Sequence, residues 1–425
     1  MLFEFQAESA LLLPFVVPGA ALALYLLGRA ARVGTMSDGL LAVLLLLNVL
    51  PVAQWMLGYA GWYDGHNGYS TFMFYVPWQL WLGWGPAFYL YFRSLTNQEF
   101  RLRGQWRHLL PALGYVAVFA GAAVYDLGWC RGVQGQALPY HFGTKGMAGN
   151  WLDGVRSLAD WLGYALMLAY GWATLRQFRQ YRRYLDDNFS DTARLRFRGL
   201  RNVLIAALLG LILWLSFEVL NGLLGPFSYG GYWYAYLANG VLIYYLALVG
   251  LHANFAAAMP LRFEPVAAVP LRPVELPFPV ESAVPVLAAA TAVVPALPSP
   301  APAAEQSDPL APELHPWREK LLALMTEEQP WLEPELTLAE LAHRLRTNTS
   351  LLSHVINTGC GQNFNDFVNR YRVAEAERKL QDPRLAHYSL VGIALESGFN
   401  SKSTFNRVFK KLTGRTPGEV ARPKS

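Results

Sequence analysis

The chain has 425 residues, a formal net charge of +5 and 53% hydrophobic residues. This length exceeds the roughly 100 to 200 residues of a typical domain, which excludes a single small domain. Twelve of the fourteen Trp lie before residue 255, together with nearly all the long apolar runs, so the composition divides the chain into unlike parts. With two Cys and no CxxC or Cys/His cluster, the sequence predicts no metal site and no cofactor.

The first 254 residues contain seven segments of the length and apolarity of membrane spans. A helix needs about 20 mostly apolar residues to cross the hydrocarbon core, because lipid offers its backbone no hydrogen-bond partners. The first nine residues include two Glu and no Lys or Arg, so we expect the first apolar run to be a retained span and not a cleaved signal peptide. The sequence thus predicts a seven-helix transmembrane bundle over residues 1–254. The predicted spans are residues 10–28, 39–60, 72–92, 109–126, 157–175, 202–220 and 233–254.

The connecting loops differ strongly in positive charge. Loops after spans one, three, five and seven carry 2, 4, 8 and 2 Lys or Arg, whereas the N-terminal segment and the loops after spans two, four and six carry 0, 0, 3 and 0. Lys and Arg favour the cytoplasmic side, so the N-terminus is expected outside and the C-terminus inside a bacterial inner (cytoplasmic) membrane. The eight Arg of residues 176–201 are expected to fix this topology and contact anionic headgroups, with nucleic-acid binding as the alternative.

Polar side chains inside membrane spans are costly and tend to mark function. In the predicted topology most of them lie in the outer half of their helices, with Asn48 as the main exception near the membrane centre. We expect a pocket open to the outer face that binds a small molecule or envelope signal, with neighbours such as Trp78, Trp161 and Tyr234. The alternative is that these side chains near helix ends only reach interfacial water. The pocket candidates are Gln54, Gln79, Asp160, Glu218 and Asn239.

Residues 255–312 contain thirteen of the 27 prolines, interleaved with Ala and Val. Such a segment cannot build a core and is expected to be a flexible, semi-extended linker. A flexible linker cannot carry a rotation or piston motion from the last span. A signal that crosses it is expected to act by dimerisation with a second copy of the chain, which raises local concentration, or by proteolytic release.

Residues 313–425 show helical periodicity and repeated helix-start signals. Thr337 followed by Glu340 forms a capping box ahead of a short apolar helix, and a polar turn leads to a second short helix. This pair is a helix-turn-helix unit. Asn363 then begins a long helix that ends near Gln381. The residues predicted to be buried are Leu338, Leu341, Ala342, Leu345, Leu352, Val355, Ile356, Phe364, Phe367, Val368 and Tyr371.

A second helix-turn-helix unit follows. Ser389 caps its first helix, Gly398 provides a residue that tolerates positive φ at the turn, and the next helix starts at Ser401. Pro417, after Thr416, begins a last short helix. The second helix of this unit carries an apolar stripe made of Phe405, Val408, Phe409 and Leu412.

The stretch IALESGFNSKSTFNRVFKKLTGRTPGEVA, residues 393–421, resembles the signature of AraC/XylS-type transcription regulators, and the resemblance extends back to about Trp317. It covers roughly a quarter of the chain. The resemblance implies a seven-helix domain in which a long helix joins two helix-turn-helix units, each placing a recognition helix in the major groove of double-stranded DNA.

The resemblance also assigns candidate DNA-binding residues by position. In the second unit Arg407 is suited to guanine and Asn406 to adenine, whereas Lys410 and Lys411 are placed for phosphate contacts. The first unit lacks the Arg or Lys that the family usually carries in its recognition helix, which weakens its expected role in base recognition. The candidates are Lys402, Ser403, Asn406, Arg407, Lys410 and Lys411 in the second unit and Ser350, Ser353 and His354 in the first.

These features predict a membrane-bound, sequence-specific DNA-binding regulator that senses a signal through its transmembrane domain. The expected partners are double-stranded DNA, membrane lipid, the signal and a second copy of the chain. Two alternatives remain open: a membrane enzyme or transporter with an attached regulatory domain, and a passive membrane anchor for a transcription factor. No predicted span carries a catalytic set of residues, so no enzymatic activity is expected.

Overall fold

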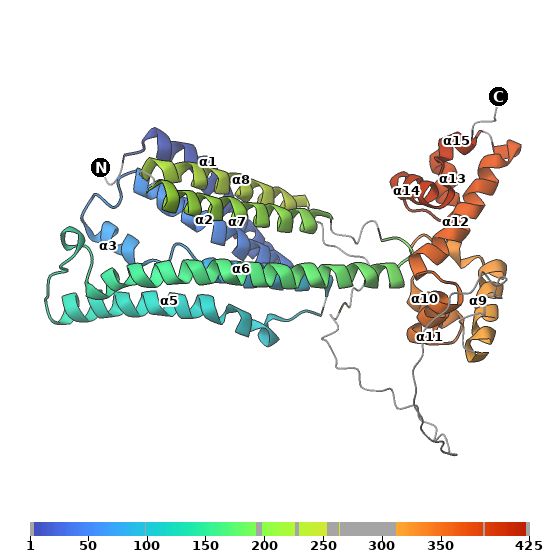
Figure 1. Cartoon of the computed structure of the whole chain (residues 1–425), viewed down its shortest axis with the longest axis horizontal. Coiled ribbons are helices and arrows are strands. Elements are labelled where there is room, and N and C mark those ends of the chain that lie inside the picture. The colour runs from blue at the N-terminus through green and yellow to red at the C-terminus, as the bar shows by residue number, and fades with distance from the viewer. Residues whose placement is uncertain are drawn as a thin grey trace, which may run out of the picture. The chain divides into compact units, whose positions relative to one another are not determined.

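In the computed structural model every regular element of the described residues is a helix (Figure 1). Within those residues the only β pairings are two isolated bridges. The predicted all-α fold class is therefore confirmed. The structure describes residues 4–97, 99–192, 198–225, 229–252, 263, 312–385 and 387–421.

The chain divides into two compact units. The N-terminal unit comprises Met1–Arg182 and Arg196–Glu264, and the C-terminal unit comprises Arg183–Leu195 and Pro265–Ser425. Part of the Arg-rich segment between predicted spans five and six therefore belongs to the C-terminal unit, which the sequence did not predict.

The predicted linker, residues 255–312, lies outside the described residues except at Phe263 and Pro312. Phe263 belongs to the N-terminal unit, where its N–H donates to the carbonyl of Thr96 and its ring contacts Tyr181. The flexibility of the linker accordingly stays a prediction.

The N-terminal unit is a bundle of long helices. Helices α1, α2 and α8 pack together and α7 packs on α8 (Figure 1). Helix α4 packs on α2. Helices α6, α7 and α8 contain the last three predicted spans. The elements are α1 (Ala7–Val33), α2 (Met36–Tyr59), α3 (Gly68–Tyr75), α4 (Trp81–Thr96), α5 (Leu110–Ala123) with a π-helical continuation (Val124–Val133), α6 (Met147–Asn188), α7 (Arg198–Leu224) and α8 (Tyr229–His252).

Glycine allows close helix packing at the centre of this bundle. A Cβ at Gly19 would lie 2.7 Å from Cγ2 of Val49 and 2.8 Å from Cγ2 of Ile243. The absence of a side chain at this position therefore lets α1 lie against both α2 and α8. Small residues serve this purpose in lipid, where close packing and not the hydrophobic effect holds helices together.

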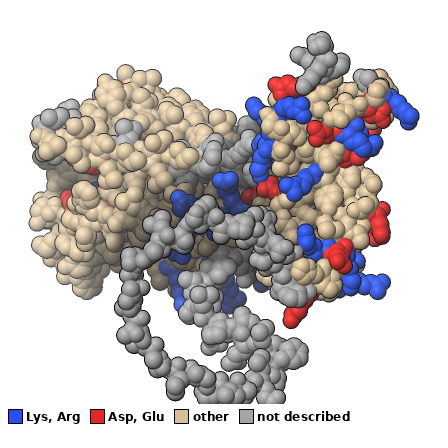
Figure 2. Space-filling view, turned by 45° about the vertical axis from the view of Figure 1, so that its right-hand side comes forward, with Lys and Arg blue, Asp and Glu red and all other residues tan. Residues whose placement is uncertain are grey.

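Three described helical segments are long and apolar enough to cross a membrane, judged by length and composition: α1, α2 and Trp106–Val133. Figure 2 shows that the N-terminal unit presents a broad face with few charged side chains. This unit also exposes large apolar side chains such as Leu11, Val17 and Leu24, and an uncharged surface with exposed apolar side chains favours contact with lipid. Membrane association of the unit is thus supported, whereas the count of seven spans and the orientation stay predictions.

The expectation of one continuous helix over residues 72–92 is wrong. The segment is divided between α3, which ends at Tyr75, and α4, which begins at Trp81. Pro77 explains the break, because proline lacks the N–H that a helix needs and disfavours helical geometry in the preceding residue. Val76 is accordingly extended, with φ −89° and ψ 129°.

The C-terminal unit contains two helix-turn-helix units joined by α12. Helices α10 and α11 form the first, α13 and α14 form the second, and α12 runs between them (Figure 1). The N-terminal half of α12 packs in the core of the first unit and its C-terminal half in the core of the second. The helices are α9 (His315–Glu327), α10 (Leu338–Arg344), α11 (Thr349–His354) with a π-helical continuation (Val355–Gly359), α12 (Phe364–Gln381), α13 (Leu390–Glu396), α14 (Lys402–Thr413) and α15 (Pro417–Ala421).

The predicted helix starts of this unit are confirmed by side-chain caps. Thr337 Oγ1 accepts from the N–H of Glu340 at 3.2 Å, and Glu340 Oε2 accepts from the N–H of Thr337 at 2.8 Å. Asn363, Ser389 and Ser401 cap α12, α13 and α14, each with a side-chain oxygen that accepts from the backbone N–H three residues later. Each such cap contributes about 1 kcal/mol, because it satisfies a donor that the helix leaves without a partner.

The predicted apolar stripe of α14 is one residue too long. Phe405, Val408 and Phe409 are buried, but Leu412 is 38% exposed. The helix ends at Thr413, and Gly414 turns the chain away with φ 74°, so no further turn of structure covers Leu412.

The turn of the second helix-turn-helix unit yields a stability prediction. Gly398 has φ +82°, and a Cβ there would lie 2.4 Å from the carbonyl oxygen of Trp331. Gly414 also has positive φ, +74°, but nothing lies within 4 Å of its Cβ position. Gly414→Ala should therefore cost only the left-handed backbone strain, about 1 kcal/mol. Gly398→Ala should cost at least about 2 kcal/mol more, because it adds a clash with backbone. Urea-dependent pulse proteolysis of the full-length protein measures both, and equal losses would contradict the close contact at Gly398.

Candidate functional site

The surface of α14 carries the predicted base-contacting residues. Thr404, Phe405, Val408 and Phe409 are buried against the core, which fixes the rotation of the helix. The opposite face is consequently exposed. All six candidates of the second unit lie on it: Lys402, Ser403, Asn406, Arg407, Lys410 and Lys411.

The two lysines near the end of α14 differ in their partners. Lys411 Nζ lies 2.7 Å from Oδ1 and 2.9 Å from Oδ2 of Asp366 in α12. This ion pair holds α14 against α12 and offsets part of the charge that a phosphate would meet. Lys410, the neighbouring candidate, lies on the exposed side, near the carboxylate of Glu419. The N–H of Thr416 holds the pKa of Glu419 below its usual value, so this carboxylate is charged at neutral pH.

The first unit presents a less basic face. Ser350 and His354 are exposed, whereas Ser353 is half-buried and its Oγ accepts from Asn357 Nδ2 at 3.2 Å. His354 Nδ1 lies 3.3 Å from Thr358 Oγ1. Ser353 and His354 thus already have partners within their own helical segment.

One exposed cation of the first unit, Arg346, was not predicted from the sequence to contact DNA. Arg346 is exposed in the turn between α10 and α11 and adopts positive φ, 53°. The turn position was recognised in the sequence, but its left-handed backbone, which sets the direction of the side chain, was not predictable from residue type. Arg346 is a candidate for a phosphate contact.

Helix α12 sets the spacing of the two units. It has 18 residues, which at 1.5 Å per residue gives a length of about 27 Å. Successive major grooves on one face of DNA are about 34 Å apart, so units at the two ends of such a helix match that spacing approximately. Charged side chains of both signs are spread over the C-terminal unit (Figure 2).

Comparisons with known proteins agree with this geometry. A family model described as a helix-turn-helix domain matches residues 341–423. The uncharacterized HTH-type transcriptional regulator YtdP of Bacillus subtilis (strain 168) is 36% identical over 92 residues, which cover 22% of this chain and 12% of that protein. The probable transcription factor PqrA of Proteus vulgaris is 30% identical over 95 residues, which cover 21% of this chain and 75% of that protein.

A solved structure of a protein of unknown function from Listeria innocua is also similar in sequence. It is 30% identical, and the match covers 24% of this chain and 92% of that chain with a TM-score of 0.22. This score is too low to support an argument about the fold. All three matches concern about a quarter of this chain or less.

Two helix-turn-helix units on one connecting helix, with a polar and basic face on the second, define a DNA-binding domain. Its sequence match spans most of PqrA. The chain belongs to the AraC/XylS-type family of helix-turn-helix transcription regulators.

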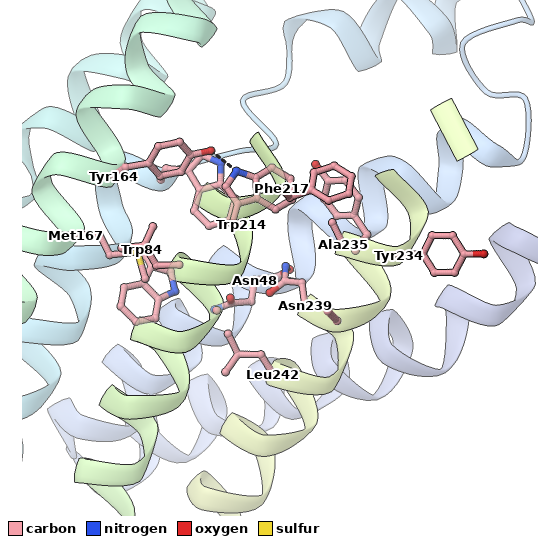
Figure 3. Close-up of a pocket in the computed structure, with 15 residues that line it drawn as sticks. Asn48, Trp84, Tyr164, Met167, Trp214, Phe217, Tyr234, Ala235, Asn239 and Leu242 are labelled. Atoms are coloured by element: carbon pink, nitrogen blue, oxygen red, sulfur yellow. Dashed lines mark hydrogen bonds between the residues drawn. The ribbon is translucent and has the colours of Figure 1, made fainter. Parts of the chain in front are cut away.

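The N-terminal unit contains a cavity of about 200 Å³ between α2, α4, α6, α7 and α8 (Figure 3). Asn48 and Asn239 are neighbouring amides in its wall. Asn48 Nδ2 donates to the carbonyl of Leu44 at 2.7 Å, and Asn239 Nδ2 donates to the carbonyl of Asn48 at 3.3 Å. Trp214 donates a hydrogen bond to Tyr164 at the edge of the cavity. We call this space the aromatic cavity; its rings belong to Trp81, Trp84, Tyr164, Trp214, Phe217, Tyr234 and Tyr236.

The five predicted pocket residues do not share one cavity. Asn239 lines the aromatic cavity. Gln79 is not among the residues that line it, but Gln79 Nε2 donates to the hydroxyl of the lining residue Tyr236 at 3.1 Å. Gln54 lines a second cavity of about 460 Å³. Asp160 and Glu218 line a third of about 250 Å³.

The predicted aromatic neighbours are divided in the same way. Trp161 lines the third cavity, Tyr234 lines the aromatic cavity, and Trp78 donates to the carbonyl of Met73. The polar residues chosen by their position in the predicted spans are divided among three cavities. Position along a span does not say which faces of the helices pack together. The buried amide of Asn48 was noticed in the sequence but not assigned to the pocket.

Proposed function

We propose that this AraC/XylS-type regulator is held in a bacterial inner membrane by its N-terminal unit, with its DNA-binding domain in the cytoplasm. The observation that carries the proposal is the presence, in one chain, of helices apolar and long enough to cross a membrane and of a complete pair of helix-turn-helix units. The loop charges favour seven spans with the N-terminus outside. The proposal assigns the chain no enzymatic activity.

Base recognition is proposed to lie mainly on α14. Arg407 is placed to donate two hydrogen bonds to guanine and Asn406 to pair with adenine, with Lys402 and Ser403 at the start of the same helix. Lys410 and Lys411 are assigned to phosphates, which position the domain without selecting sequence. Ser350, Ser353 and His354 of α11 are assigned a weaker role, since their helix carries no Arg or Lys.

Arg407→Ala tests the assignment of base recognition. The variant should lose about 1 to 3 kcal/mol of binding to its preferred sites and should relax the preference at one base pair, because a bidentate contact to guanine is removed. Selection of bound sequences from a random duplex library, with the full-length protein in nanodiscs, measures both effects. Glu319→Ala, at an exposed position of α9 outside both helix-turn-helix units, is the control and should leave the preference unchanged. An Arg407→Ala protein with unchanged sequence preference would refute the assignment.

The two native cysteines report on the proposed topology. Cys130, after predicted span four, is expected outside the membrane, and Cys360, in the DNA-binding domain, inside; both are free and partly exposed. A membrane-impermeant maleimide should label Cys130 in intact spheroplasts and Cys360 only after permeabilisation. Cys130→Ser and Cys360→Ser variants isolate each signal, and labelling of Cys360 from outside would exclude the topology.

The rate of labelling at Cys360 should also depend on pH in a defined way. Burial raises the pKa of the Cys360 thiol above its usual value, so less of the reactive thiolate is present at neutral pH. In permeabilised cells its labelling is expected to accelerate at a higher pH than the labelling of an unperturbed thiol, because its pKa is raised.

Sensing is proposed to use the aromatic cavity. Its rings favour a small, mostly apolar or aromatic ligand. Within the described part of the chain neither Oδ1 of Asn48 nor Oδ1 of Asn239 accepts a hydrogen bond, so a ligand with a donor group has two acceptors available. Binding of a ligand of this class is expected of a sensor and not of a passive membrane anchor.

Filling the aromatic cavity separates these two roles. Ala235→Phe should abolish changes in transcription with stimulus while DNA binding is retained, because the added ring occupies space that the ligand needs. Val241→Phe, on the exposed side of the same helix, is the matched control. Genome-wide transcript profiles across candidate stimuli provide the measurement. Unchanged responses in Ala235→Phe would exclude this cavity as the sensor site.

A further inference from the structure

The end of α6 and the residues that follow it belong to the C-terminal unit. Arg183–Leu195 is part of that unit. The exposed fraction is 0% for Leu185, 7% for Phe189 and 1% for Ser190. Burial of this degree differs from the sequence expectation for a loop that contacts lipid headgroups. We call residues 185–192 the docking segment.

The backbone of the docking segment pairs with the start of the first helix-turn-helix unit. The N–H of Ser190 donates to the carbonyl of Leu336 at 3.2 Å, and Phe189 forms an isolated antiparallel bridge with Thr337. Thr337 is the cap of α10. The segment therefore contacts the point at which the first unit begins.

Two asparagines of α12 bind the carbonyls of the same segment. Asn365 Nδ2 donates to Phe189 O at 3.0 Å and to Ser190 O at 2.7 Å. Asn369 Nδ2 donates to Ser190 O at 3.3 Å and to Asn365 Oδ1 at 3.1 Å. Both asparagines are buried, so these carbonyls take the place of water as their hydrogen-bond partners.

Arg372 completes this polar face, one turn further along α12. Its Nη2 donates to Ser190 Oγ at 3.1 Å and to Glu333 O at 2.6 Å, and its Nε donates to Trp331 O at 2.8 Å. Burial lowers the pKa of Arg372 to about 10, and the charge of Asp191 opposes this change. The guanidinium is thus charged at neutral pH and needs these acceptors, since an unpaired buried charge is costly.

The same network reaches the second helix-turn-helix unit. Pro334 O, which lies 3.4 Å from Arg372 Nη2, also accepts from Asn400 Nδ2 at 3.4 Å. Asn400 directly precedes Ser401, the cap of α14. Hydrogen bonds therefore connect the docking segment, through Arg372 and Pro334, to the start of the proposed recognition helix.

We propose that residues 185–192 dock on the DNA-binding domain of their own chain and hold its two helix-turn-helix units in one relative orientation. The proposal rests on the proposed membrane location in one respect. The docking segment continues α6, and residues 147–182 of α6 belong to the N-terminal unit that is proposed to lie in the membrane. A conformational signal can then reach the DNA-binding domain through a helix and need not cross the linker of residues 255–312. In this proposal the segment has two states: docked on the DNA-binding domain and released from it.

Hydrogen exchange of the full-length protein in nanodiscs tests docking. Backbone amides of residues 189–192 should be protected in the parent protein. The double variant Asn365→Ala/Asn369→Ala should exchange there at least about fivefold faster, the change expected from loss of one hydrogen bond. Asn357→Ala, an exposed asparagine of the same unit, is the matched control and should change nothing. Amides of α12 report whether the double variant remains folded.

Ser190→Pro provides a second variant that leaves the sequence of residues 312–421 intact. It removes the N–H donated to Leu336 and the hydroxyl bound by Arg372, so amides of Phe189 and Asp191 should also exchange at least about fivefold faster. In DNA binding, this variant should lose at least about fivefold in affinity for a mapped full operator relative to a single half-site, because the docking segment no longer holds the two units in one relative orientation.

Three results would overturn the proposal: fast exchange of residues 189–192 in the parent, protection unchanged in both variants, or protection that falls on dilution, which would show that a second copy supplies the segment. Failure of the proposed function is distinguishable. An Arg407→Ala protein with unchanged sequence preference would reject the base-contact assignment without altering exchange at residues 189–192.

Discussion

A buried guanidinium organises the DNA-binding domain. Arg372 is 1% exposed, and its donors bind carbonyls of the segment that precedes α10 together with the hydroxyl of Ser190. A charge removed from water must keep all these partners, so the positions of the partner carbonyls relative to α12 are tightly constrained. Gly398, whose missing side chain leaves room for the carbonyl of Trp331, brings the turn of the second unit to the same place. This contact region thus links the first helix-turn-helix unit to the turn that precedes α14.

The N-terminal unit is stabilised by different interactions. Its helices approach closely at Gly19, and its interior holds aromatic rings around two amides, Asn48 and Asn239. Polar groups inside an apolar bundle are stable when their donors are satisfied, as these are by backbone carbonyls. The N-terminal unit thus has an interior of aromatic rings around two amides, the C-terminal unit has an exposed polar and basic helix face, and α6 has residues in both units.

Local features of the DNA-binding domain could be predicted from the sequence. The caps at Thr337, Ser389 and Ser401 and the exposed face of α14 follow from residue types three or four positions apart. The exposure of Leu412 was not predicted, because the apolar pattern does not show where packing against the core ends. The break at Pro77 was predictable from proline chemistry, but the apolar run on both sides of it obscured the signal.

Long-range contacts could not be predicted in this way. Asn365 and Phe189 are 176 residues apart, and no periodicity links them. A signal was nevertheless present: Asn365, Asn369 and Arg372 recur at helical spacing beside the apolar Phe364, Val368 and Val373, and polar side chains on a packed face need partners. The same reason explains why the five predicted pocket residues fall into three cavities, since the sequence gives the depth of each residue in a span but not which helix faces meet.

A sequence-specific DNA-binding domain is proposed to operate from a membrane. DNA can be cross-linked in living cells, the membrane fraction isolated, and the DNA that is bound to the full-length chain sequenced. A small set of enriched sites that share one motif should then be recovered with the membranes. Recovery of the chain in membranes without enriched DNA, or of bound DNA only with soluble chain, would contradict the proposal.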